Sequence, residues 1–142
     1  GAIMNILRVV LDTNVIFEGL TQRKGVCGAI IDAWFEDLIQ VNISNALAYE
    51  YSDVLSRKLS PARYIEAADT LDVLLSQSKY VTTNFRWRPS SPDPGDEFLI
   101  DCAMNANAVL ITSNVRDFRL AQHSLGLAVL TPQIYLRLLL NE

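Results

Sequence analysis

The sequence predicts a single α/β domain with a central parallel sheet of about five strands and helices on both faces. Short, almost wholly apolar segments alternate with segments of helical periodicity, and half of the 142 residues are apolar. Uninterrupted apolar strands are typical of parallel sheets covered on both faces. A chain of this length forms one domain with a real core. We therefore treat residues 1–142 as one domain and expect residues 1–3, before Met4, to be a cloning remnant.

The first half of the chain contains three predicted strands and four predicted helices. Residues 6–11 form an apolar strand that ends on Asp12. The later elements are a helix over 14–20, a helix over 26–38, a strand over 39–43, a helix capped by Ser44 or Asn45, a helix opened by Pro61, and a brief strand over 79–82. Apolar residues spaced by three and four define the last two helices. These residues are Leu47, Tyr51, Val54 and Leu55, then Ile65, Ala68, Leu71, Leu74 and Leu75.

The second half begins with the irregular segment NFRWRPSSPDPGD, where Pro, Ser and Gly cluster. A helix over 94–107 follows, then a strand over 108–112, the turn SNVRDF, a strand over 127–130 and a closing helix from Pro132. In such a sheet, ligands bind beyond the carboxyl ends of the strands, where the connection order reverses. Asp12 and the segment 112–114 both follow strands, so we expect them at this edge.

Composition limits the possible partners. The net charge of −4 at pH 7 argues against binding nucleic acid through overall charge, so a polyanion would need a local basic patch or bound cations. No apolar segment is long enough to cross a bilayer and no leader is recognisable, so we expect a soluble cytoplasmic protein without a membrane partner. Cys27 and Cys102 are expected to be reduced core thiols. The only histidine, His123, is expected in a surface loop.

Three acidic residues occupy positions where a solvated acid is not expected. Asp12 follows the first strand, at the expected ligand edge. Glu50 shares the apolar stripe of its helix, and Asp96 precedes two inward-facing residues of its own helix by three and four positions. By the same criterion, Asp53 and Asp101 are expected to face solvent.

Each of these acids also has a simpler explanation. Asp12 and Asp93 are suited to cap helices, Asp96 suits a first helical turn, and Glu50 could form a buried ion pair. Three inward acids at one edge, however, repel one another and lose hydration unless a cation neutralises them. Carboxylates without a Cys or His network select hard cations, Mg2+ or Mn2+. Such ions can generate a hydroxide and stabilise the leaving oxygen of a phosphodiester, so the pattern indicates a nuclease.

Four segments in this order resemble the PIN domain nucleases, in particular the toxin components of bacterial and archaeal toxin-antitoxin systems. The segments are VLDTNV, SNALAYEYSDVL, DPGDEFLIDCAMNANAVLITSN and RDF, and together they span nearly the whole chain. The resemblance implies a flavodoxin-like sheet with strand order 3-2-1-4-5 and metal-dependent cleavage of RNA to 5′-phosphate and 3′-hydroxyl ends. It also implies a small antitoxin protein as partner and often a homodimer. Such an antitoxin would dock an apolar helix and could place a basic side chain against the acidic pocket.

By position, the resemblance implies that Asp12, Glu50 and Asp96 are the first three acids of the site. Family members commonly carry a fourth acid where this chain has Asn114, and Asp117 is the nearest substitute. Asn can accept through its oxygen or hold a metal-bound water, but one negative charge is lost. The expected supporting residues are Thr13, Asn14, Thr112 and Asp93.

Basic residues near this edge are the candidate RNA contacts. Arg86, Trp87 and Arg88 precede the Asp93 turn and offer two cations for phosphates and an indole for base stacking. Arg23 and Lys24 follow the first helix and could form the opposite rim of the acidic site. The alternative is that all are ordinary solvated loop residues, with the Trp covering the core.

Two further function classes fit parts of the sequence. A haloacid-dehalogenase-like phosphotransferase also places an Asp after the first strand, but it needs a second Asp where this chain has Asn14 and a Lys that is absent after Tyr80. A receiver domain would likewise need a Lys after the last strand. A PIN-like module that binds RNA or protein without catalysis is compatible with Asn114.

Overall fold

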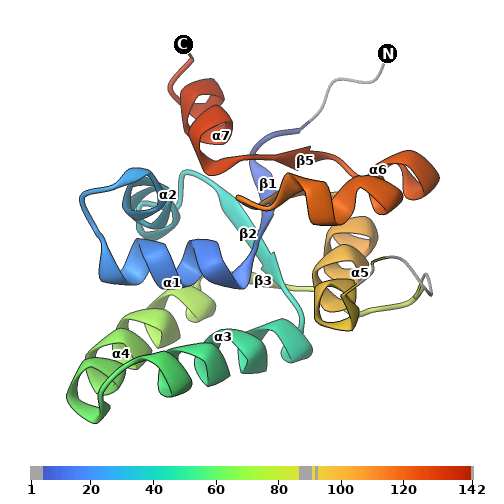
Figure 1. Ribbon diagram of the computed structural model, residues 1–142. Helices are drawn as coiled ribbons and strands as arrows, with labels where there is room; N and C mark the ends of the chain where they lie inside the picture. Colours follow the sequence, from blue (N-terminus) through green and yellow to red (C-terminus); the bar gives the residue numbers. More distant parts are fainter. Residues whose placement is uncertain (1–4, 87–90, 92, 142) are drawn as a thin grey trace.

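The protein forms a central parallel sheet with helices on both faces (Figure 1). The structure is a computed structural model that describes residues 5–86, 91 and 93–141. The strands of this part of the chain are β1 (Arg8–Leu11), β2 (Gln40–Ile43), β3 (Lys79–Tyr80), β4 (Val109–Ile111) and β5 (Val129–Leu130). Their order in the sheet is β3-β2-β1-β4-β5, and every pairing is parallel. The predicted fold class and strand order are therefore confirmed.

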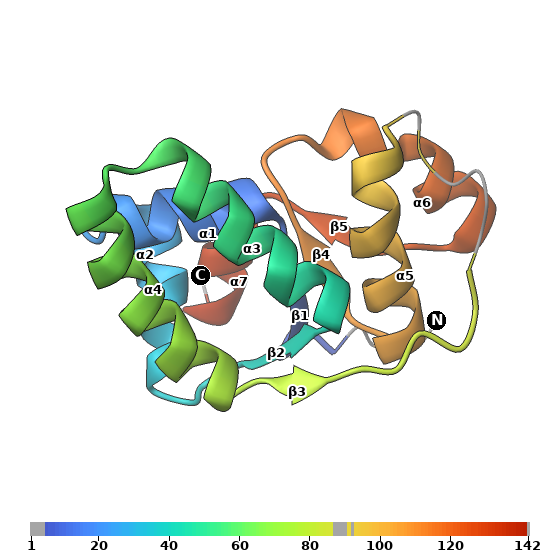
Figure 2. The same ribbon diagram turned by 90° about the horizontal axis from the view of Figure 1, so that it is seen from below.

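Helices surround this sheet in two layers (Figures 1 and 2). They are α1 (Thr13–Thr21), α2 (Val26–Phe35), α3 (Asn45–Lys58), α4 (Pro61–Ser76), α5 (Glu97–Ala106), α6 (Arg119–Leu125) and α7 (Pro132–Leu139), with single 3-10 turns η1 (Pro94–Asp96) and η2 (Val115–Phe118). Helices α1, α2 and α7 lie on one side of the sheet, and α5 lies on the other, against β1, β2 and β4. Helix α3 packs on α1 and α4 and also reaches α5. None of the helices in the described residues is long and apolar enough to cross a membrane.

The connection order reverses at β1, which pairs with both β2 and β4. Val9 aligns with Val41 on one side, and Leu11 aligns with Ile111 on the other. Residues that follow β1 and β4 therefore meet at the carboxyl edge of the sheet although about a hundred positions separate them in sequence. This edge is the expected ligand site of an open α/β sheet.

The core forms around the central strand β1, where Val9, Val10 and Leu11 are fully buried. Helices α1 and α2 approach closely because Gly19 of α1 has no side chain: a Cβ there would lie 2.8 Å from the backbone oxygen of Cys27 on α2. Both cysteines are free and buried, as expected for core thiols.

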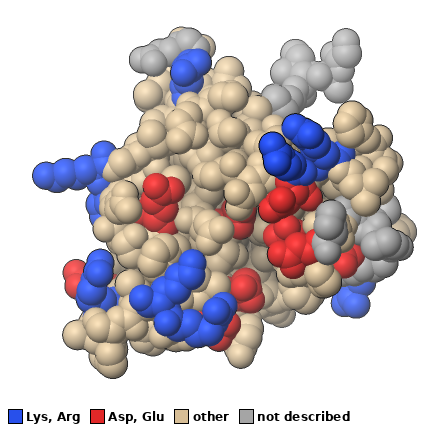
Figure 3. Space-filling model, viewed as in Figure 1, with Lys and Arg blue, Asp and Glu red and all other residues tan. Residues whose placement is uncertain are grey.

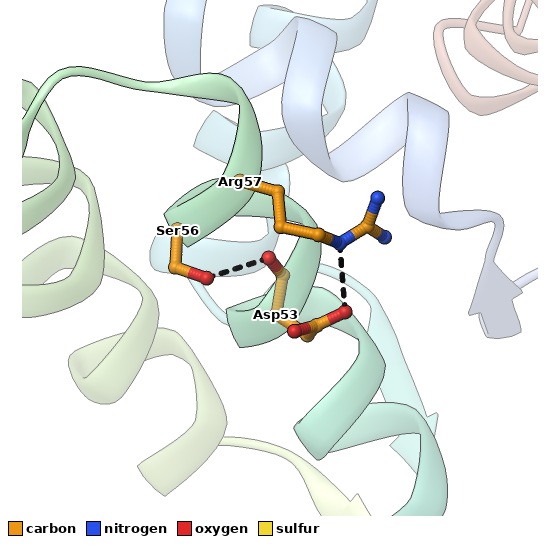
Figure 4. A network of polar contacts seen from close by, with 3 residues as sticks. All are labelled: Asp53, Ser56 and Arg57. Carbon is orange, nitrogen blue, oxygen red and sulfur yellow. Dashed lines mark hydrogen bonds and ion pairs between the residues drawn. The ribbon is translucent and has the colours of Figure 1, made fainter.

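Several local predictions are wrong in detail. The helix expected over 94–107 begins as the 3-10 turn η1, and the 113–125 region contains η2 and α6, so the exposed His123 lies on a helix and not in a loop. Ile65, placed on the buried face of α4, is 62% exposed. Asp101, expected to face solvent, is buried with only 3% of its surface exposed. Asp53 is partly exposed and pairs with Arg57 on the surface of α3, beside Ser56 (Figure 4).

Candidate functional site

Asp12 lies where β1 ends and α1 begins, and its side chain points across the sheet edge. Its backbone N–H donates to the carbonyl of Ile111 at 2.9 Å, which joins the ends of β1 and β4. Its carboxylate is buried and accepts a hydrogen bond from Thr112 Oγ1 at 2.6 Å. The carboxylate makes no capping hydrogen bond to α1. The side chain of Asp12 is thus held by Thr112, the residue that follows β4.

Thr112 is a bridge between the two strand ends. It is fully buried, and its backbone N–H donates to the carbonyl of Leu130 on β5. Its hydroxyl donates to Asp12 and accepts from the backbone N–H of Asn114 at 3.0 Å. Thr112 therefore lies at the site, with its backbone N–H and its hydroxyl both engaged.

The pKa of Asp12 is raised above its ordinary value. Burial is the largest cause, because it disfavours the charged form, and the negative charge of Asp117 adds to it. The hydrogen bond from Thr112 and the nearby backbone amides of Asn14 and Thr13 act in the opposite direction and favour the carboxylate. A cation beside Asp12 would complete this stabilisation of the charged form.

Asp96 lies near the same site, at the junction of η1 and α5. Burial and the charges of Asp93, Asp12 and Asp117 raise its pKa to about 6, with a smaller opposing effect of a hydrogen bond from Ser91. Its Oδ2 atom is buried and has no hydrogen-bond partner within the described residues. A buried carboxylate oxygen without a partner is costly, so a ligand at this atom would be stabilising.

Asp93 acts as a helix cap, as the sequence indicated. Its exposed side chain accepts from the backbone N–H of Gly95 at 2.9 Å and so closes the η1 turn. Its charge still contributes to the raised pKa of Asp96. Capping does not exclude the outer acceptor role, which stays a prediction.

Asn114 and Asp117 occupy the η2 turn at the exposed rim of this site. The carbonyl of Asn114 accepts from the backbone N–H of Asp117 at 3.0 Å, so one turn fixes both residues. Asp117 raises the pKa of Asp12 and of Asp96, which places its charge close to both. Asp117 is therefore the acid that η2 brings nearest to the pair.

Glu50, the expected second acid, makes no contact that links it to Asp12, Asp96 or Asp117 within the described residues. It lies half-buried on α3, and its carboxylate has no hydrogen bond or ion pair with another described residue. Its charge is not among the causes of the raised pKa of Asp12 or Asp96. The ion pair considered as its alternative is absent from the described residues as well, so its role stays a prediction.

Tyr51, the next residue on α3, is a positioning residue that the sequence pattern did not reveal. The sequence placed it on the apolar stripe, and it is fully buried. Its hydroxyl donates to the carbonyl of Leu11 at 2.6 Å, one residue before Asp12. An aromatic residue on a buried stripe looks purely apolar in sequence, because only the fold brings the hydroxyl to the strand end.

The predicted RNA contacts lie in different places. Arg86 is exposed on the segment after β3, while Trp87 and Arg88 lie outside the described residues. Arg23 pairs with Asp32 on α2 and stacks over the ring of Phe35, so it is committed to the α1–α2 turn. Lys24 is exposed beside it, and Thr13 and Asn14 form the first turn of α1 next to Asp12.

Acidic side chains gather on the face seen in Figure 3, over α5 and the segment between β4 and α6. Groups of Lys and Arg lie beside this acidic area. The two exposed cations nearest to Asp117 in sequence are Arg116 and Arg119. A chain with net charge −4 thus carries local positive charge next to its acidic pocket.

The residues of the pocket fit a hard divalent cation. Their donors are carboxylate, amide and hydroxyl oxygens, and Asp96 offers a buried oxygen that lacks a partner within the described part of the chain. No three His, Cys, Asp or Glu side chains among the described residues already surround one ion position. Mg2+ is commonly held by only one or two carboxylates and keeps several waters, so a site for it does not require three acidic side chains.

Fold and site together define a flavodoxin-like α/β domain with an acidic pocket at the carboxyl ends of β1 and β4. Comparison with protein families finds a match to the PIN domain over residues 8–116, which is most of the chain. The chain therefore belongs to the PIN domain family, whose members are nucleases that generally use divalent metal ions. Comparison with curated protein sequences gives no match.

Solved structures with the same fold include complexes of PIN proteins. VapBC2 from Rickettsia felis, bound to a DNA fragment from its promoter, is similar with a TM-score of 0.63 and 14% identity over 87% of this chain and 98% of that chain. VapBC-1 from nontypeable Haemophilus influenzae gives a TM-score of 0.61 and 18% identity over 89% and 98%. FitAcB from Neisseria gonorrhoeae gives 0.60 and 17% over 88% and 98%. At these identities the likeness supports the fold.

Proposed function

We propose that this protein is a metal-dependent endoribonuclease that hydrolyses phosphodiester bonds of RNA with Mg2+ or Mn2+. The observation that carries the proposal is the pairing of Asp12 and Asp96 at the carboxyl edge, with Asp117 beside them, in a chain of the PIN domain family. Carboxylates with a raised pKa, one of them with a buried oxygen that has no partner within the described residues, support a cation site, since a cation would relieve the cost of burying them.

Asp12 and Asp96 are the residues that would hold the ion, with Asn114 and Asp117 at its outer side. When bound, a divalent ion supplies Lewis-acid stabilisation of the phosphate and lowers the pKa of water. Thr112 orients Asp12 by donating its hydroxyl proton, and Tyr51 fixes the strand end from which Asp12 projects. Glu50, on the neighbouring helix, is proposed as the further acid that receives a proton during hydrolysis.

The proposed cellular role is that of the toxin in a type II toxin-antitoxin pair. The support is the likeness in fold to the PIN components of the VapBC and FitAB complexes. The implied partner is a small antitoxin protein, and a homodimer and a cytoplasmic location belong to the same proposal. The test is growth after induction of this gene, alone and together with a small open reading frame found adjacent to it in the genome. Growth unaffected by the protein alone would refute the toxin role.

The activity is tested by incubating single-stranded and structured RNA with the purified protein in Mg2+, in Mn2+ or in a chelator. We expect cleavage only with metal, and loss by orders of magnitude in Asp12→Asn and Asp96→Asn, since each removes a ligand charge. Asp72→Asn, which removes an exposed charge on α4, is the matched control and should cleave like the wild type.

A second comparison concerns α3. Glu50→Gln should lower cleavage strongly while Asp53→Asn on the same helix, which only breaks the surface pair with Arg57, should not. Cleavage that survives in the chelator and in both aspartate variants would identify a contaminating ribonuclease and refute the assignment. Metal-dependent RNA binding without cleavage would instead favour the non-catalytic module, in line with Asn114.

A further inference from the structure

A second cavity opens at the same edge of the sheet, between the first turn of α3, the residues after β3, and α5. Its volume is about 370 Å³. Its wall includes Asn45, Tyr80, Thr83, Arg86, Phe98 and Asp101. We refer to it as the α3–α5 pocket.

The wall of this pocket combines exposed aromatic rings with one cation. Tyr80 is 55% exposed and Phe98 is 46% exposed, although large aromatic side chains are normally buried. Arg86 is exposed and takes part in neither of the ion pairs found within the described residues. Exposed rings beside an unpaired arginine are the usual elements of a site for unpaired nucleotides.

The distribution of charge indicates which part of a nucleotide would enter. Tyr80 and Phe98 contribute aromatic ring surfaces to the wall, which suit a flat base better than a charged phosphate. Arg86 contributes a positive charge to the same wall. A neutral base therefore fits the inside of the pocket, with its phosphate next to Arg86.

The pocket and the acidic site are both built partly from the N-terminal half of α5. Asp96 is the N-cap of α5, and Phe98 follows two residues later in the first turn of this helix. Asp101 lies about 7 Å further along the helix axis than Asp96 at the usual rise per residue. Figure 2 shows α3 beside α5 at the carboxyl edge of the sheet, and the two helices are in contact. A single strand that leaves the acidic site between these helices would reach the pocket within a short distance.

We infer that the α3–α5 pocket binds one unpaired base of single-stranded RNA next to the phosphate that is cleaved. Phe98 and Tyr80 supply the stacking surfaces and Arg86 binds the adjoining phosphate. The inference rests on the proposed ribonuclease function, and it assigns to these residues the binding of RNA and not the chemistry.

The test measures binding of a labelled RNA octamer in a chelator, so that no cleavage occurs, by fluorescence anisotropy. Phe98→Ala should weaken binding about tenfold, the effect of losing one base stack. Arg86→Ala should weaken binding and reduce its salt slope by about 0.7 units, as expected for one lost phosphate contact with a single strand. The controls are Tyr49→Ala, an exposed aromatic residue of α3 outside the pocket, and Arg63→Ala, an exposed cation of α4; both should bind like the wild type.

An abasic substitution identifies the base. A set of octamers is compared in which each member lacks the base at a different position. At one position, removal of the base should weaken binding to the wild-type protein. Removal of the same base should not weaken the binding of Phe98→Ala any further. Wild-type protein that binds and cleaves RNA, with both pocket variants unchanged, would overturn the pocket and leave the nuclease standing. Wild-type protein that neither binds nor cleaves RNA would overturn both.

Discussion

Replacing Asp96 with Asn tests whether the carboxylates at the sheet edge are crowded. Burial and the charges of Asp93, Asp12 and Asp117 raise the pKa of Asp96 from 3.8 to about 6. A carboxyl group whose pKa is raised by folding favours the protonated form in the folded state. Its contribution to stability is therefore fully present below pH 3.8 and is lost as the pH rises through about 6. Near neutral pH, charged Asp96 destabilises the metal-free protein.

The size of this effect follows from the pKa shift. One pKa unit corresponds to about 1.4 kcal/mol, so a fully buried carboxyl with this shift would cost about 3 kcal/mol. Asp96 is only half-buried, and solvent screening reduces the cost to about 1 kcal/mol. Asp96→Asn keeps the shape of the side chain and removes the charge. In a chelator near neutral pH it should raise the melting temperature by about 3 °C.

The assay is a set of melting curves for wild type and Asp96→Asn at about pH 4 and about pH 7.5, each with chelator and with excess Mn2+. At the lower pH the gain should nearly vanish, because Asp96 of the wild type is then protonated. With Mn2+ at about 100 times its Kd, the wild type gains about 2.7 kcal/mol and the variant gains less, so their order should reverse. Asp72→Asn is the control for simple loss of a negative charge. Equal melting temperatures of wild type and Asp96→Asn under all four conditions would refute both the crowding and the metal site.

Three further substitutions examine the neighbours of this carboxylate. Thr112→Val should lower the free energy of unfolding by about 1–3 kcal/mol, since buried partners lose their hydrogen bonds, and should raise the pKa of Asp12 further. Chemical denaturation measures the stability and NMR titration of the carboxyl groups measures the pKa, and Thr112→Ser should restore both values. An unchanged pKa of Asp12 would contradict the bridging role of Thr112. Tyr51→Phe should cost about 1–3 kcal/mol by leaving the Leu11 carbonyl unpaired and should lower the rate of RNA cleavage by displacing Asp12, so a variant with wild-type stability and rate would remove the positioning role. Asn114→Asp should tighten Mn2+ binding in calorimetry while lowering the metal-free melting temperature, and no change in either would place residue 114 outside the site.

The sheet and its acidic edge could be predicted because both depend on local patterns. Apolar strands followed by polar residues indicate a parallel sheet, and the carboxyl ends of adjacent parallel strands meet at one edge. The strand end predicted Asp12, the apolar spacing of its helix predicted Asp96, and the family resemblance predicted Asp117 as the nearest acid to Asn114. These residues follow strand β1, begin helix α5 and lie in the turn after β4.

The remaining errors come from contacts between segments that are remote in sequence. Asp101 lies off the apolar stripe of α5, yet the segment after β3 crosses this helix and its backbone bonds to the side chain of Asn105, one turn after Asp101. Periodicity identifies the face turned toward the sheet, but it cannot tell which loop covers another face. The same limit applies to Tyr51, whose partner Leu11 is 40 positions away.

Helix α6 was missed for a different reason. Seven residues are too few for a clear period, and isolated helices of this length are not stable in water. The helix depends on burial of Ala121 and of Phe118 just before it, and it ends at Gly126 in the left-handed conformation. Its existence is a property of the packed fold more than of its own sequence.

The capping pattern of the helices distinguishes a cap from a site at Asp12. Side chains cap three helices in the ordinary way, and these are Ser44 for α3, Ser60 for α4 and Thr131 for α7. Asp93 also caps, at the start of η1. Asp12 and Asp96 stand at the N-cap positions of α1 and α5, yet neither makes a capping hydrogen bond. Omitting a cap costs about 1 kcal/mol, and the two aspartates that omit it are the two with a raised pKa at the same edge. The carboxylate of Asp12 instead accepts from Thr112 at the neighbouring strand end, and Oδ2 of Asp96 has no partner within the described residues, an arrangement that a bound cation would stabilise and a capping role would not require.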